Sequence, residues 1–469
     1  MKRNSPLLVV VALFCVVGVA GVVGCTSLND RLNKSSVPPE ARKKNQTRAA
    51  LAAEPPAIAA QADQRIAPAT RPTTSAASTT GPHARDDGFF VGIAISGGGS
   101  RSANFSAACM FQLHRLGILQ RADYLSAVSG GTLSAAYYCI SDDQQWNPGN
   151  VQRKLAHSFA SDLIWNTVLP WNFAALMLSD WDRSDLLGDS FQKTLFSRNG
   201  KGLTFGDLRA DRPRLLLNAT DLQTGKSFVF CNETFDQINS DLSAYPLGQA
   251  CAASSAVPVL LHQVTLRDYN TAFKQYRHLI DGGVVDNLGV RTLVETYSAH
   301  LRGGNESAYP RGAVFIVIDA RTQYDARISG RGDTTLLESF YFGAGITSTV
   351  LINRASSATL AEMILDSAPD GVDAKTLRKE REDLIEGGYV RLENIHGRPV
   401  YVLHLALSRV NELADLPFKT FSETVNSIST YFNIKPTEAH HLYQAAELLV
   451  KQRYKKQLES IAEELNRQP

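Results

Sequence analysis

The sequence predicts an α/β protein whose central sheet is mostly parallel, and three observations carry this prediction. Residues 89–96 form a mostly apolar run of the kind that becomes a buried strand. A glycine-rich loop and a helical pattern over residues 102–116 follow, and residues 124–128 then have the pattern of a second strand. A sharp turn leads into another helical pattern over residues 132–140. Such alternation is typical of parallel strands joined by crossover helices.

Composition limits the classes of function. The chain has 469 residues, of which 44% are hydrophobic and 20% are charged, and its formal net charge is +2. Enough apolar side chains are present for a packed core, which argues against wholesale disorder. A dedicated nucleic-acid binder needs a strongly basic face, so this charge balance argues against that class as well.

The first 25 residues have the pattern of a secretory signal. Lys2 and Arg3 precede an apolar run over residues 7–24, and small residues lead up to Cys25. The ending Val-Val-Gly-Cys resembles a bacterial lipobox, which implies that residues 1–24 are removed and that Cys25 carries lipid. Thr26 stands where an Asp would favour the inner membrane, so we expect a protein anchored in the bacterial cell envelope, at the outer membrane in a Gram-negative cell. The alternative is an uncleaved signal anchor, because about 18 apolar residues can just span a bilayer.

Residues 25–88 are predicted to be a disordered tether between this anchor and the body. Residues 26–88 contain no Phe, Trp or Tyr but hold fourteen Ala and seven Pro. Such a segment has little apolar surface to bury against the entropy lost on ordering. Its net charge is +3, so the basic character of the chain lies at this end rather than on the body.

Further strands are expected in the body at residues 214–220, 227–231, 276–280 and 313–318. Beyond residue 330 the pattern becomes mostly helical. We therefore divide the body into a catalytic domain over residues 89–330 and a mainly helical extension over residues 331–469, packed on that domain. The extension includes an apolar stretch at 337–352, which is either a core helix or a channel wall, and helical patterns at 374–386 and 440–466.

Ser129 occupies a sharp turn between a predicted strand and a predicted helix. The run Ala127-Val128-Ser129-Gly130-Gly131 matches the G-x-S-x-G turn that presents a nucleophilic serine, with Ala127 in place of the first Gly. The small residues allow a tight turn, and the following helix directs its N-terminus at the serine. A lone Ser-Gly-Gly is also common in ordinary turns, which is the alternative interpretation.

The run Gly97-Gly98-Gly99-Ser100-Arg101 is a second candidate site. Backbone N–H groups can approach a ligand closely where side chains are absent, and a cluster of such groups forms an anion hole. The alternative is a dinucleotide or phosphate loop. The third Gly of G-x-G-x-x-G is missing, because Ser102 stands there, and no G-x-x-x-x-G-K-[ST] is present.

The run Asp281-Gly282-Gly283 ends a predicted strand and is the third candidate. A carboxylate at the carboxyl end of a strand suits the rim of an active site, although a lone Asp-Gly-Gly is usually only a turn. Asn287 follows six residues later.

Together these motifs resemble those of the patatin-like phospholipases. The segment Ala253-Ser254-Ser255-Ala256-Val257-Pro258 also matches the Ala-Ser-x-Ala-x-Pro segment that lies between serine and aspartate in that family. The resemblance covers residues 89–320 and implies a three-layer α/β fold around a mostly parallel sheet. Departures from the family pattern are Ala127, Ser102 and Gly289, the last replacing the Pro that usually follows the Asn-Leu pair.

The resemblance also implies a chemistry. Ser129 would attack an acyl carbonyl, Asp281 would act as general base, and the N–H groups of Gly97, Gly98 and Gly99 would stabilise the oxyanion with help from Arg101. The motif-supporting residues would be Gly130, Gly131, Gly282, Gly283 and Asn287. We therefore expect a serine acyl hydrolase, of the phospholipase A or lipid esterase type among carboxylic ester hydrolases, which needs no metal or organic cofactor and whose partners are lipid esters and a membrane.

Two alternatives stay open at this point. A Ser–His–Asp triad would draw its histidine from those that follow Asp281, namely His300, His396 and His404, but none lies in a glycine-rich loop. His262 and His278 are expected to be structural. The other alternative is a lipoprotein that binds lipid without turning it over.

Two further groups of residues have predicted environments. Trp165 and Trp171 lie among apolar residues, and we favour packing on the core over a membrane-facing lid. The cysteines beyond Cys25 show no CxxC spacing that would indicate a metal or redox site. Cys109 and Cys139 lie in apolar helical patterns, where buried free thiols are common, although an exported protein could form disulfides. These cysteines are Cys109, Cys139, Cys231 and Cys251.

Overall fold

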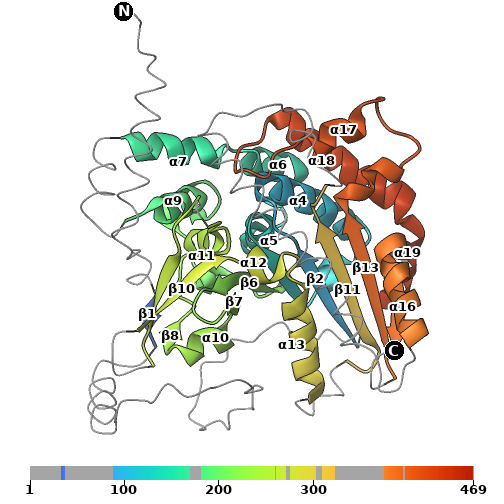
Figure 1. Ribbon diagram of the computed structural model, residues 1–469, viewed down its shortest axis with the longest axis horizontal. Helices are drawn as coiled ribbons and strands as arrows, with labels where there is room; N and C mark the ends of the chain where they lie inside the picture. Colours follow the sequence, from blue (N-terminus) through green and yellow to red (C-terminus); the bar gives the residue numbers. More distant parts are fainter. Residues whose placement is uncertain are drawn as a thin grey trace, which may run out of the picture.

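A sheet of nine strands runs through the computed structural model of the chain (Figure 1). The structure describes residues 33–36, 88–169, 181–258, 260–270, 275–302, 309–322, 374–393 and 397–467. Along the sheet the order is β12-β13-β11-β2-β3-β6-β10-β9, and β7 pairs with β6 off this path. The strands are β2 (Phe89–Ile95), β3 (Tyr124–Val128), β6 (Arg214–Asp221), β7 (Lys226–Phe230), β9 (Val264–Asp268), β10 (Gln275–Asp281), β11 (Gly312–Asp319), β12 (Tyr389–Glu393) and β13 (Pro399–Ala406).

The centre of the sheet is parallel, as predicted. Strands β13, β11, β2, β3 and β6 are paired in parallel in that order, whereas β12, β7, β10 and β9 are antiparallel to their neighbours. Alternate residues of β2 enter different cores: Ile93 and Ile95 face one side, and Phe90 and Ala94 face the other. Because both faces are covered, the central strands are apolar throughout rather than alternating with polar residues.

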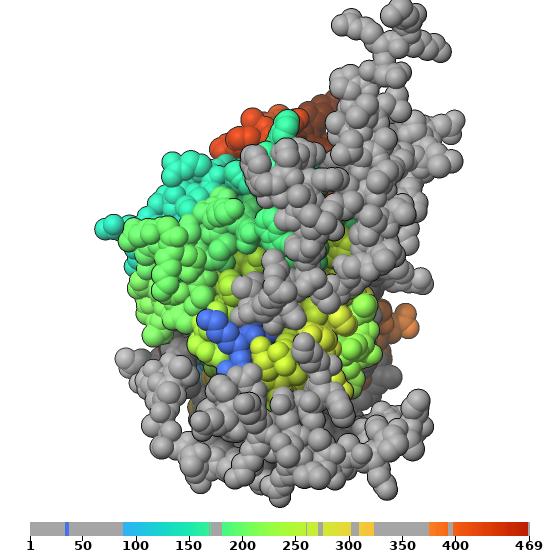
Figure 2. Space-filling model, turned by 90° about the vertical axis from the view of Figure 1, so that its left-hand side faces the viewer, coloured from blue at the N-terminus to red at the C-terminus, as the bar shows by residue number. Residues whose placement is uncertain are grey.

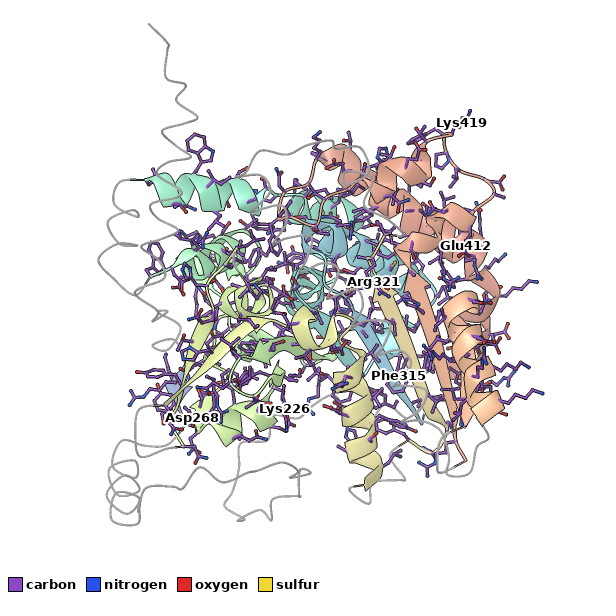
Figure 3. All side chains as sticks on the ribbon, viewed as in Figure 1. Lys226, Asp268, Phe315, Arg321, Glu412 and Lys419 are labelled. Atoms are coloured by element: carbon purple, nitrogen blue, oxygen red, sulfur yellow. The ribbon has the colours of Figure 1, made fainter. Side chains whose placement is uncertain are left out.

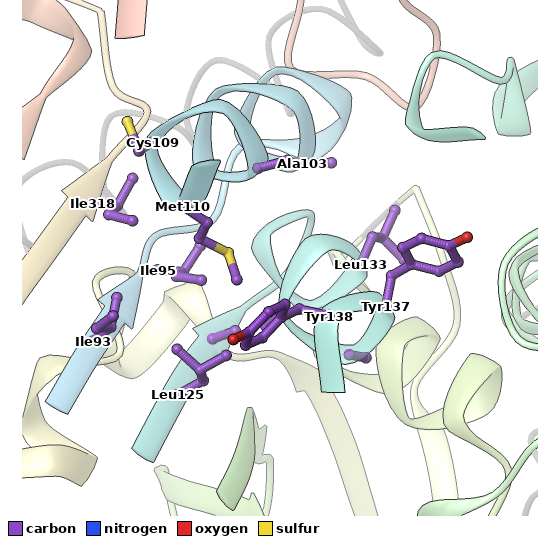
Figure 4. Close-up of a cluster of buried hydrophobic side chains, with 14 of the residues drawn as sticks. Ile93, Ile95, Ala103, Cys109, Met110, Leu125, Leu133, Tyr137, Tyr138 and Ile318 are labelled. Atoms are coloured by element: carbon purple, nitrogen blue, oxygen red, sulfur yellow. The ribbon is translucent and has the colours of Figure 1, made fainter. Parts of the chain in front are cut away.

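Helices form the two outer layers of this three-layer fold. One face of the sheet packs on α4, α5 and α11, and α18 packs on α4 outside them; the other face packs mainly on α13. Figure 4 shows Ile95 and Leu125 of the sheet beside Met110 of α4. The helices are α4 (Gly99–Arg115), α5 (Gly131–Ile140), α6 (Pro148–Leu155), α7 (Phe159–Val168), α9 (Arg183–Thr194), α10 (Asn232–Gln237), α11 (Leu247–Ser254), α12 (Gly283–Asp286), α13 (Val290–Arg302), α16 (Ala374–Glu382), α17 (Phe421–Asn426), α18 (Pro436–Leu448) and α19 (Lys455–Asn466).

Strands β3 and β10 meet end to end along one edge of β6. Val128 of β3 pairs with Asn218, and Asp281 of β10 pairs with the next residue, Ala219. Strand β7 pairs with β6 over the same stretch and therefore occupies the opposite edge. Since β3 and β10 run in opposite directions, their carboxyl ends face each other across one residue step of β6.

The part of the chain beyond residue 330 is not only a helical extension. Strands β12 and β13 join the central sheet, and residues 400–406 of β13 pair in parallel with β11. The mostly buried run 399–406 covers an edge that β11 would otherwise leave open. The helix predicted over 440–466 is two helices, α18 and α19, joined by a π-helical turn at Leu449–Arg453. The stretch 337–352 lies outside the described residues.

A short piece of the predicted tether is docked on the body. Strand β1 (Lys34–Ser35) pairs antiparallel with β8 (Ser240–Asp241). The expectation of a tether without structure is therefore wrong for residues 33–36, and the rest of residues 26–87 lies outside the described part. A small hairpin joins β4 (Ser197–Arg198) to β5 (Lys201–Gly202). Among the described residues, no helix is long and apolar enough to cross a membrane.

Candidate active site

Ser129 follows the last residue of β3 and adopts a left-handed backbone conformation, with φ of 49°. Positive φ is unusual for a residue with a side chain and costs of order 1 kcal/mol or more, so surrounding contacts must hold it. The N–H and hydroxyl of Thr132 donate to the Ser129 carbonyl at 2.9 and 2.6 Å. Helix α5 then begins at Gly131, so Ser129 sits at the junction of strand and helix, as the turn motif predicts.

Gly130 and Gly131 are needed because other main-chain atoms approach them closely. A Cβ atom on Gly130 would overlap the carbonyl oxygen of Gly99, and one on Gly131 would lie 2.6 Å from atoms of Ile95 and Ser96. The serine turn is thus packed directly against the end of β2 and the glycine loop that follows it. Ala127, which replaces the first Gly of the motif, is fully buried in β3.

Asp281 is the last residue of β10, and its carboxyl group and the Ser129 side chain are close enough to interact. The head-to-head meeting of β3 and β10 along β6 brings these two side chains together from positions 152 residues apart in the chain. Both are nearly inaccessible, with 6% of Ser129 and 2% of Asp281 exposed. A serine next to a buried carboxylate is an arrangement suited to nucleophilic catalysis.

Burial raises the pKa of Asp281 to about 6. The Gly283 N–H, which donates to the carboxylate at 2.7 Å, and the nearby Ser129 side chain favour the charged form and oppose this shift. The carboxylate is therefore ionised at neutral pH but is a stronger base than an ordinary aspartate. A base of this strength is matched to general-base work near pH 7.

The segment Ser254–Ala256 holds both turns of the site. The Ser254 hydroxyl accepts the Ser129 N–H at 2.8 Å and donates to the Asn218 carbonyl at 2.5 Å. Main-chain carbonyls of the same segment accept from the aspartate turn: Ser254 O from Gly282 N–H at 3.2 Å, and Ala256 O from Asp281 N–H at 2.9 Å. The sequence singled out this segment as a motif but assigned no role to Ser254.

Asn218 is a second residue that sequence reasoning missed. Its side-chain amide donates to Ser126 Oγ at 2.9 Å and to the Ala127 carbonyl at 3.0 Å, and its oxygen accepts from the Thr292 hydroxyl at 2.6 Å. These bonds tie β6 to β3 and α13 directly beneath Ser129. The available signal was one polar residue within the apolar run of β6, because a buried amide needs several partners.

The glycine loop lies beside Ser129, but its three amides are not equivalent. A Cβ atom on Gly97 would lie 3.2 Å from the Cβ of Ser129. The Gly97 N–H already donates to the Asn287 carbonyl at 2.9 Å, so it is not available to an oxyanion. Gly98 and Gly99 have φ of 134° and 55°, and within the described residues no acceptor pairs with their N–H groups. Gly98 and Gly99 are therefore the candidate donors, and Gly97 is a structural member of the loop.

Arg101 lies in the first turn of α4 and is buried. Its guanidinium donates to the Ile428 carbonyl at 3.0 Å and to the Thr322 hydroxyl at 3.5 Å. The segment that follows Ile428 covers the same helix end: a Cβ on Gly99 would overlap the Thr430 carbonyl, and Ser100 N–H donates to Tyr431 O at 3.4 Å. Arg101 therefore ties the C-terminal part of the chain to the glycine loop.

Asn287 lies between the glycine loop and the aspartate turn. Its side-chain oxygen is so close to Gly97 and Gly283 that a Cβ on either residue would crowd it. Ser102, which replaces the last Gly of the family loop, donates its hydroxyl to the Ser96 carbonyl at 2.5 Å and so helps to hold the loop. All the predicted glycines, together with Asn287, are thus within one small region around Ser129 and Asp281.

The histidines occupy other places. His404 Nε2 lies 2.9 Å from the carboxylate of Asp319, which Arg321 also contacts at 2.7 Å (Arg321 is labelled in Figure 3). Strand β13, which carries His404, is three strands from β3, or about 14 Å at the usual strand spacing. His300 pairs with the Tyr124 hydroxyl at 3.0 Å, and His278 pairs with that of Thr265 at 3.1 Å. The geometry does not support a Ser–His–Asp triad with His404; His396 lies outside the described residues.

The structure also gives the environments of the possible metal ligands, the tryptophans and the cysteines. Within the described part of the chain, no three His, Cys, Asp or Glu side chains are grouped to hold a metal ion. Trp165 is 70% exposed, so core packing is wrong for this residue, while Trp171 lies outside the described residues. The free cysteines are Cys109, Cys139, Cys231 and Cys251, of which Cys231 is half-buried and the others are buried.

Fold and site together define an α/β protein with a serine–aspartate pair beneath a glycine loop. Residues 93–294 match the family model described as patatin-like phospholipase. The matched segment, a patatin-like phospholipase domain by its family model, holds Ser129, Asp281, the glycine loop and the 254–256 segment. No curated protein matches the chain significantly.

The solved structures that match this chain share little sequence with it. Human GIVD cytosolic phospholipase A2 matches with a TM-score of 0.48 and 11% identity over 81% of this chain and 63% of that one. Its complex with methyl gamma-linolenyl fluorophosphonate gives 0.45 and 12% over 81% and 59%. VipD from Legionella pneumophila gives 0.29 and 13% over 78% and 67%. This chain spans less than two thirds of the length of the human protein, and the family model carries the assignment.

Proposed function

We propose that the chain is a serine acyl hydrolase that cleaves fatty-acyl esters of phospholipids or other lipids. The observation that carries the proposal is the head-to-head meeting of β3 and β10 along β6, which brings the Ser129 hydroxyl and the Asp281 carboxyl group together. A serine hydroxyl needs an adjacent base to become nucleophilic, and Asp281 is the proposed base. The patatin-like phospholipase domain supports the choice of lipid esters as substrates.

In the first step, Ser129 Oγ attacks the acyl carbon while its proton passes to Asp281. The carbonyl oxygen becomes an oxyanion, which the N–H groups of Gly98 and Gly99 are proposed to stabilise. These donors belong to the loop that begins α4, so the positive end of the helix dipole adds to their effect. The tetrahedral intermediate then collapses: the ester C–O bond breaks, and the departing alcohol takes the proton from Asp281.

In the second step, water attacks the acyl-serine. Asp281 accepts a proton from the water, and the same amides hold the second oxyanion. The Ser129 ester bond breaks, Ser129 recovers its proton from Asp281, and the fatty acid leaves. A carboxylate whose pKa is about 6 can accept and return a proton in both halves of this cycle.

The test is Ser129→Ala in the full chain, assayed on short-chain nitrophenyl esters and on phospholipid. The expected loss in kcat/KM is at least about 10⁴-fold, as for other nucleophilic serines. The matched control is Ser197→Ala, which makes the same change on an exposed hairpin. Wild-type hydrolysis by purified Ser129→Ala would overturn the proposal, and lipid binding without turnover would then be the better account.

We further propose that Cys25 carries the lipid that holds the protein in the bacterial cell envelope, at the outer membrane in a Gram-negative cell. The support is the Val-Val-Gly-Cys sequence at the end of an apolar run preceded by Lys2 and Arg3. Cys25→Ala should abolish incorporation of a labelled fatty acid into the protein and release it from the membrane fraction. Unchanged incorporation would contradict the anchor.

A further inference from the structure

The side-chain amide of Asn33 forms two hydrogen bonds to the main chain of Arg267, as the backbone of a neighbouring strand would. Its Nδ2 donates to the Arg267 carbonyl at 2.8 Å, and its Oδ1 accepts the Arg267 N–H at 3.0 Å. The side chain is almost completely buried, with 1% exposed. Both polar groups of Arg267 lie on the free edge of β9, the last strand of the sheet, so Asn33 satisfies an edge that would otherwise face water.

The residues around Asn33 add further bonds to the same surface. The Tyr269 hydroxyl donates to the Asn33 carbonyl at 2.7 Å, and Asn33 Nδ2 also donates to Ser240 Oγ at 3.1 Å. That hydroxyl in turn donates to the Lys34 carbonyl at 2.9 Å, and Lys34 and Ser35 pair with β8. Figure 2 shows this segment, in blue, lying against the surface of the green and yellow-green part of the body.

These contacts select asparagine at position 33. Bonding to both groups of Arg267 requires a donor and an acceptor at the end of one side chain, which a carboxylate lacks because it only accepts. An Asp at this position would bury a charge against the Arg267 carbonyl, at a substantial desolvation cost. The Asn33 side chain therefore contributes much of the hold on this segment, in a stretch that has few apolar residues.

We propose that residues 33–36 form an intramolecular clamp that keeps the body close to the lipid anchor, so that the enzyme acts on the membrane that carries it. This inference rests on the proposed function, both the hydrolase activity and the lipid on Cys25. Only residues 26–32 separate Cys25 from Asn33.

The clamp greatly shortens the length of tether between the lipid anchor and the body. Eight residue steps from Cys25 to Asn33 span at most about 28 Å, whereas the 64 steps from Cys25 to Phe89 would span up to about 220 Å. Arg267 pairs with Tyr276, which precedes Asp281 by five residues on β10, so the clamp lies about 17 Å from the site along that strand. The anchor of a clamped chain can therefore reach the level of the site.

A disulfide between paired positions tests the docking without any assay of activity. Lys34 and Asp241 are directly opposed in the antiparallel pair, a spacing that a disulfide can bridge. Lys34→Cys with Asp241→Cys should oxidise to an intramolecular crosslink in the folded full chain. Lys34→Cys with Glu459→Cys, whose exposed second position lies on α19 across the molecule (Figure 1), should not. Failure of the first pair to crosslink would overturn the clamp.

The functional test compares hydrolysis within and between vesicles. Lipidated full-length protein is inserted into phosphatidylethanolamine–phosphatidylglycerol vesicles that contain one fluorescent phospholipid, and vesicles with a second fluorescent phospholipid are added. Asn33→Asp should lower the ratio of same-vesicle to other-vesicle hydrolysis by about 20-fold, because effective concentration falls as roughly the −3/2 power of tether length. Asn45→Asp makes the same change elsewhere in the predicted tether and should leave the ratio unchanged.

The outcomes separate the clamp from the functions on which it rests. Hydrolysis of a soluble ester should be the same in wild type and Asn33→Asp, since Asn33 is remote from Ser129. If Asn33→Asp keeps the wild-type ratio on vesicles, the clamp has no role in presenting the membrane and the inference is overturned. If wild type cleaves no ester, or stays off the vesicles, the hydrolase or the anchor fails instead, and the disulfide result alone then supports or overturns the docking.

Discussion

The main-chain N–H of Ser129 donates to the side-chain hydroxyl of Ser254 at 2.8 Å. The carbonyl of Ser254 also accepts the N–H of Gly282, the residue after Asp281. One residue therefore contacts the turn that carries the candidate nucleophile and the turn that carries the candidate base. Ser254 fixes how these turns meet and helps to hold the positive φ of Ser129.

Ser254→Ala should lower kcat by about 10- to 100-fold with little change in KM. The substitution leaves the buried N–H of Ser129 without a partner, at a cost of about 1–3 kcal/mol, and we expect the turn to shift to recover one. Ser254→Thr, which restores the hydroxyl, should recover most of the activity. Steady-state kinetics gives kcat and KM of each variant, and its melting temperature shows whether the fold is retained.

The matched control is the neighbouring Ser255→Ala. The Ser255 hydroxyl is buried, but within the described part of the chain it has no hydrogen-bond partner. This variant should keep a kcat close to that of wild type. An equal loss of kcat in both variants would mean that the effect is general packing and not the bond to Ser129.

The pH dependence of kcat/KM should follow the ionisation of Asp281. Burial raises the pKa of this carboxyl to about 6, and only the carboxylate can accept the proton of Ser129. Activity should therefore fall as the pH decreases through about 6, with a limiting slope of one proton. A profile that stays flat down to pH 4.5 in the folded protein would contradict Asp281 as the base.

The same shift predicts that Asp281 destabilises the folded protein at neutral pH. Its folded pKa of about 6 lies above the ordinary value of 3.8, so the native state holds the proton more tightly than the unfolded state. The free energy of unfolding should thus decrease as pH rises from about 4 to about 6. Asp281→Asn should remove this decrease and stabilise the fold at pH 7 by up to about 3 kcal/mol while abolishing hydrolysis. Denaturant unfolding of wild type and Asp281→Asn at pH 4 and pH 7 measures the pH dependence of stability and the stabilisation at pH 7.

Gly130→Ala should inactivate and destabilise the protein. The added methyl group would overlap the carbonyl oxygen of Gly99 and push the glycine loop away from Ser129. Overpacking of this kind typically costs about 1–3 kcal/mol of stability. Gly387→Ala, where nothing lies within 4 Å of the new atom, is the control and should retain activity. Full activity in Gly130→Ala would show that the loop and the serine turn do not need this close approach.

His404→Gln should leave ester hydrolysis within about three-fold of wild type, whereas loss of a triad histidine costs about 10⁴-fold or more. His404 pairs with Asp319, three strands from the candidate nucleophile. The guanidinium of Arg321 and the hydrogen bond with His404 hold the pKa of Asp319 well below its usual range, even though burial opposes this. Some loss of stability is therefore expected, and activity must be measured on folded material. A 10⁴-fold loss would restore the triad hypothesis.

Local patterns predicted much of the fold and of the site. The apolar run at 124–128, followed by Ser129 and two glycines, forms the predicted strand and turn, because strand length and turn chemistry are local properties. The end-to-end meeting of β3 and β10 depends on pairing between distant strands, which no local pattern encodes. For the same reason, the role of Ser254 and the docking of Asn33 were not predicted from sequence.

The sequence could not predict which N–H groups of the glycine loop are free to bind an oxyanion. The three glycines 97–99 were equivalent in the sequence, yet Gly97 donates to the Asn287 carbonyl while Gly98 and Gly99 have no acceptor among the described residues. The assignment of Arg101 to the oxyanion had the same weakness, since its partner Ile428 is more than 300 residues away. Which donors are free depends on tertiary contacts that a motif does not contain.

The central claim is that Ser129 is the nucleophile that Asp281 activates, and covalent labelling tests it most directly. The wild-type protein is incubated with a fluorophosphonate probe at pH 8, and the adduct is located by peptide mass spectrometry. We predict a single adduct on Ser129, its absence from Ser129→Ala, and greatly slowed formation in Asp281→Asn. Folded wild-type protein that forms no adduct, or forms it at another residue, would contradict the account.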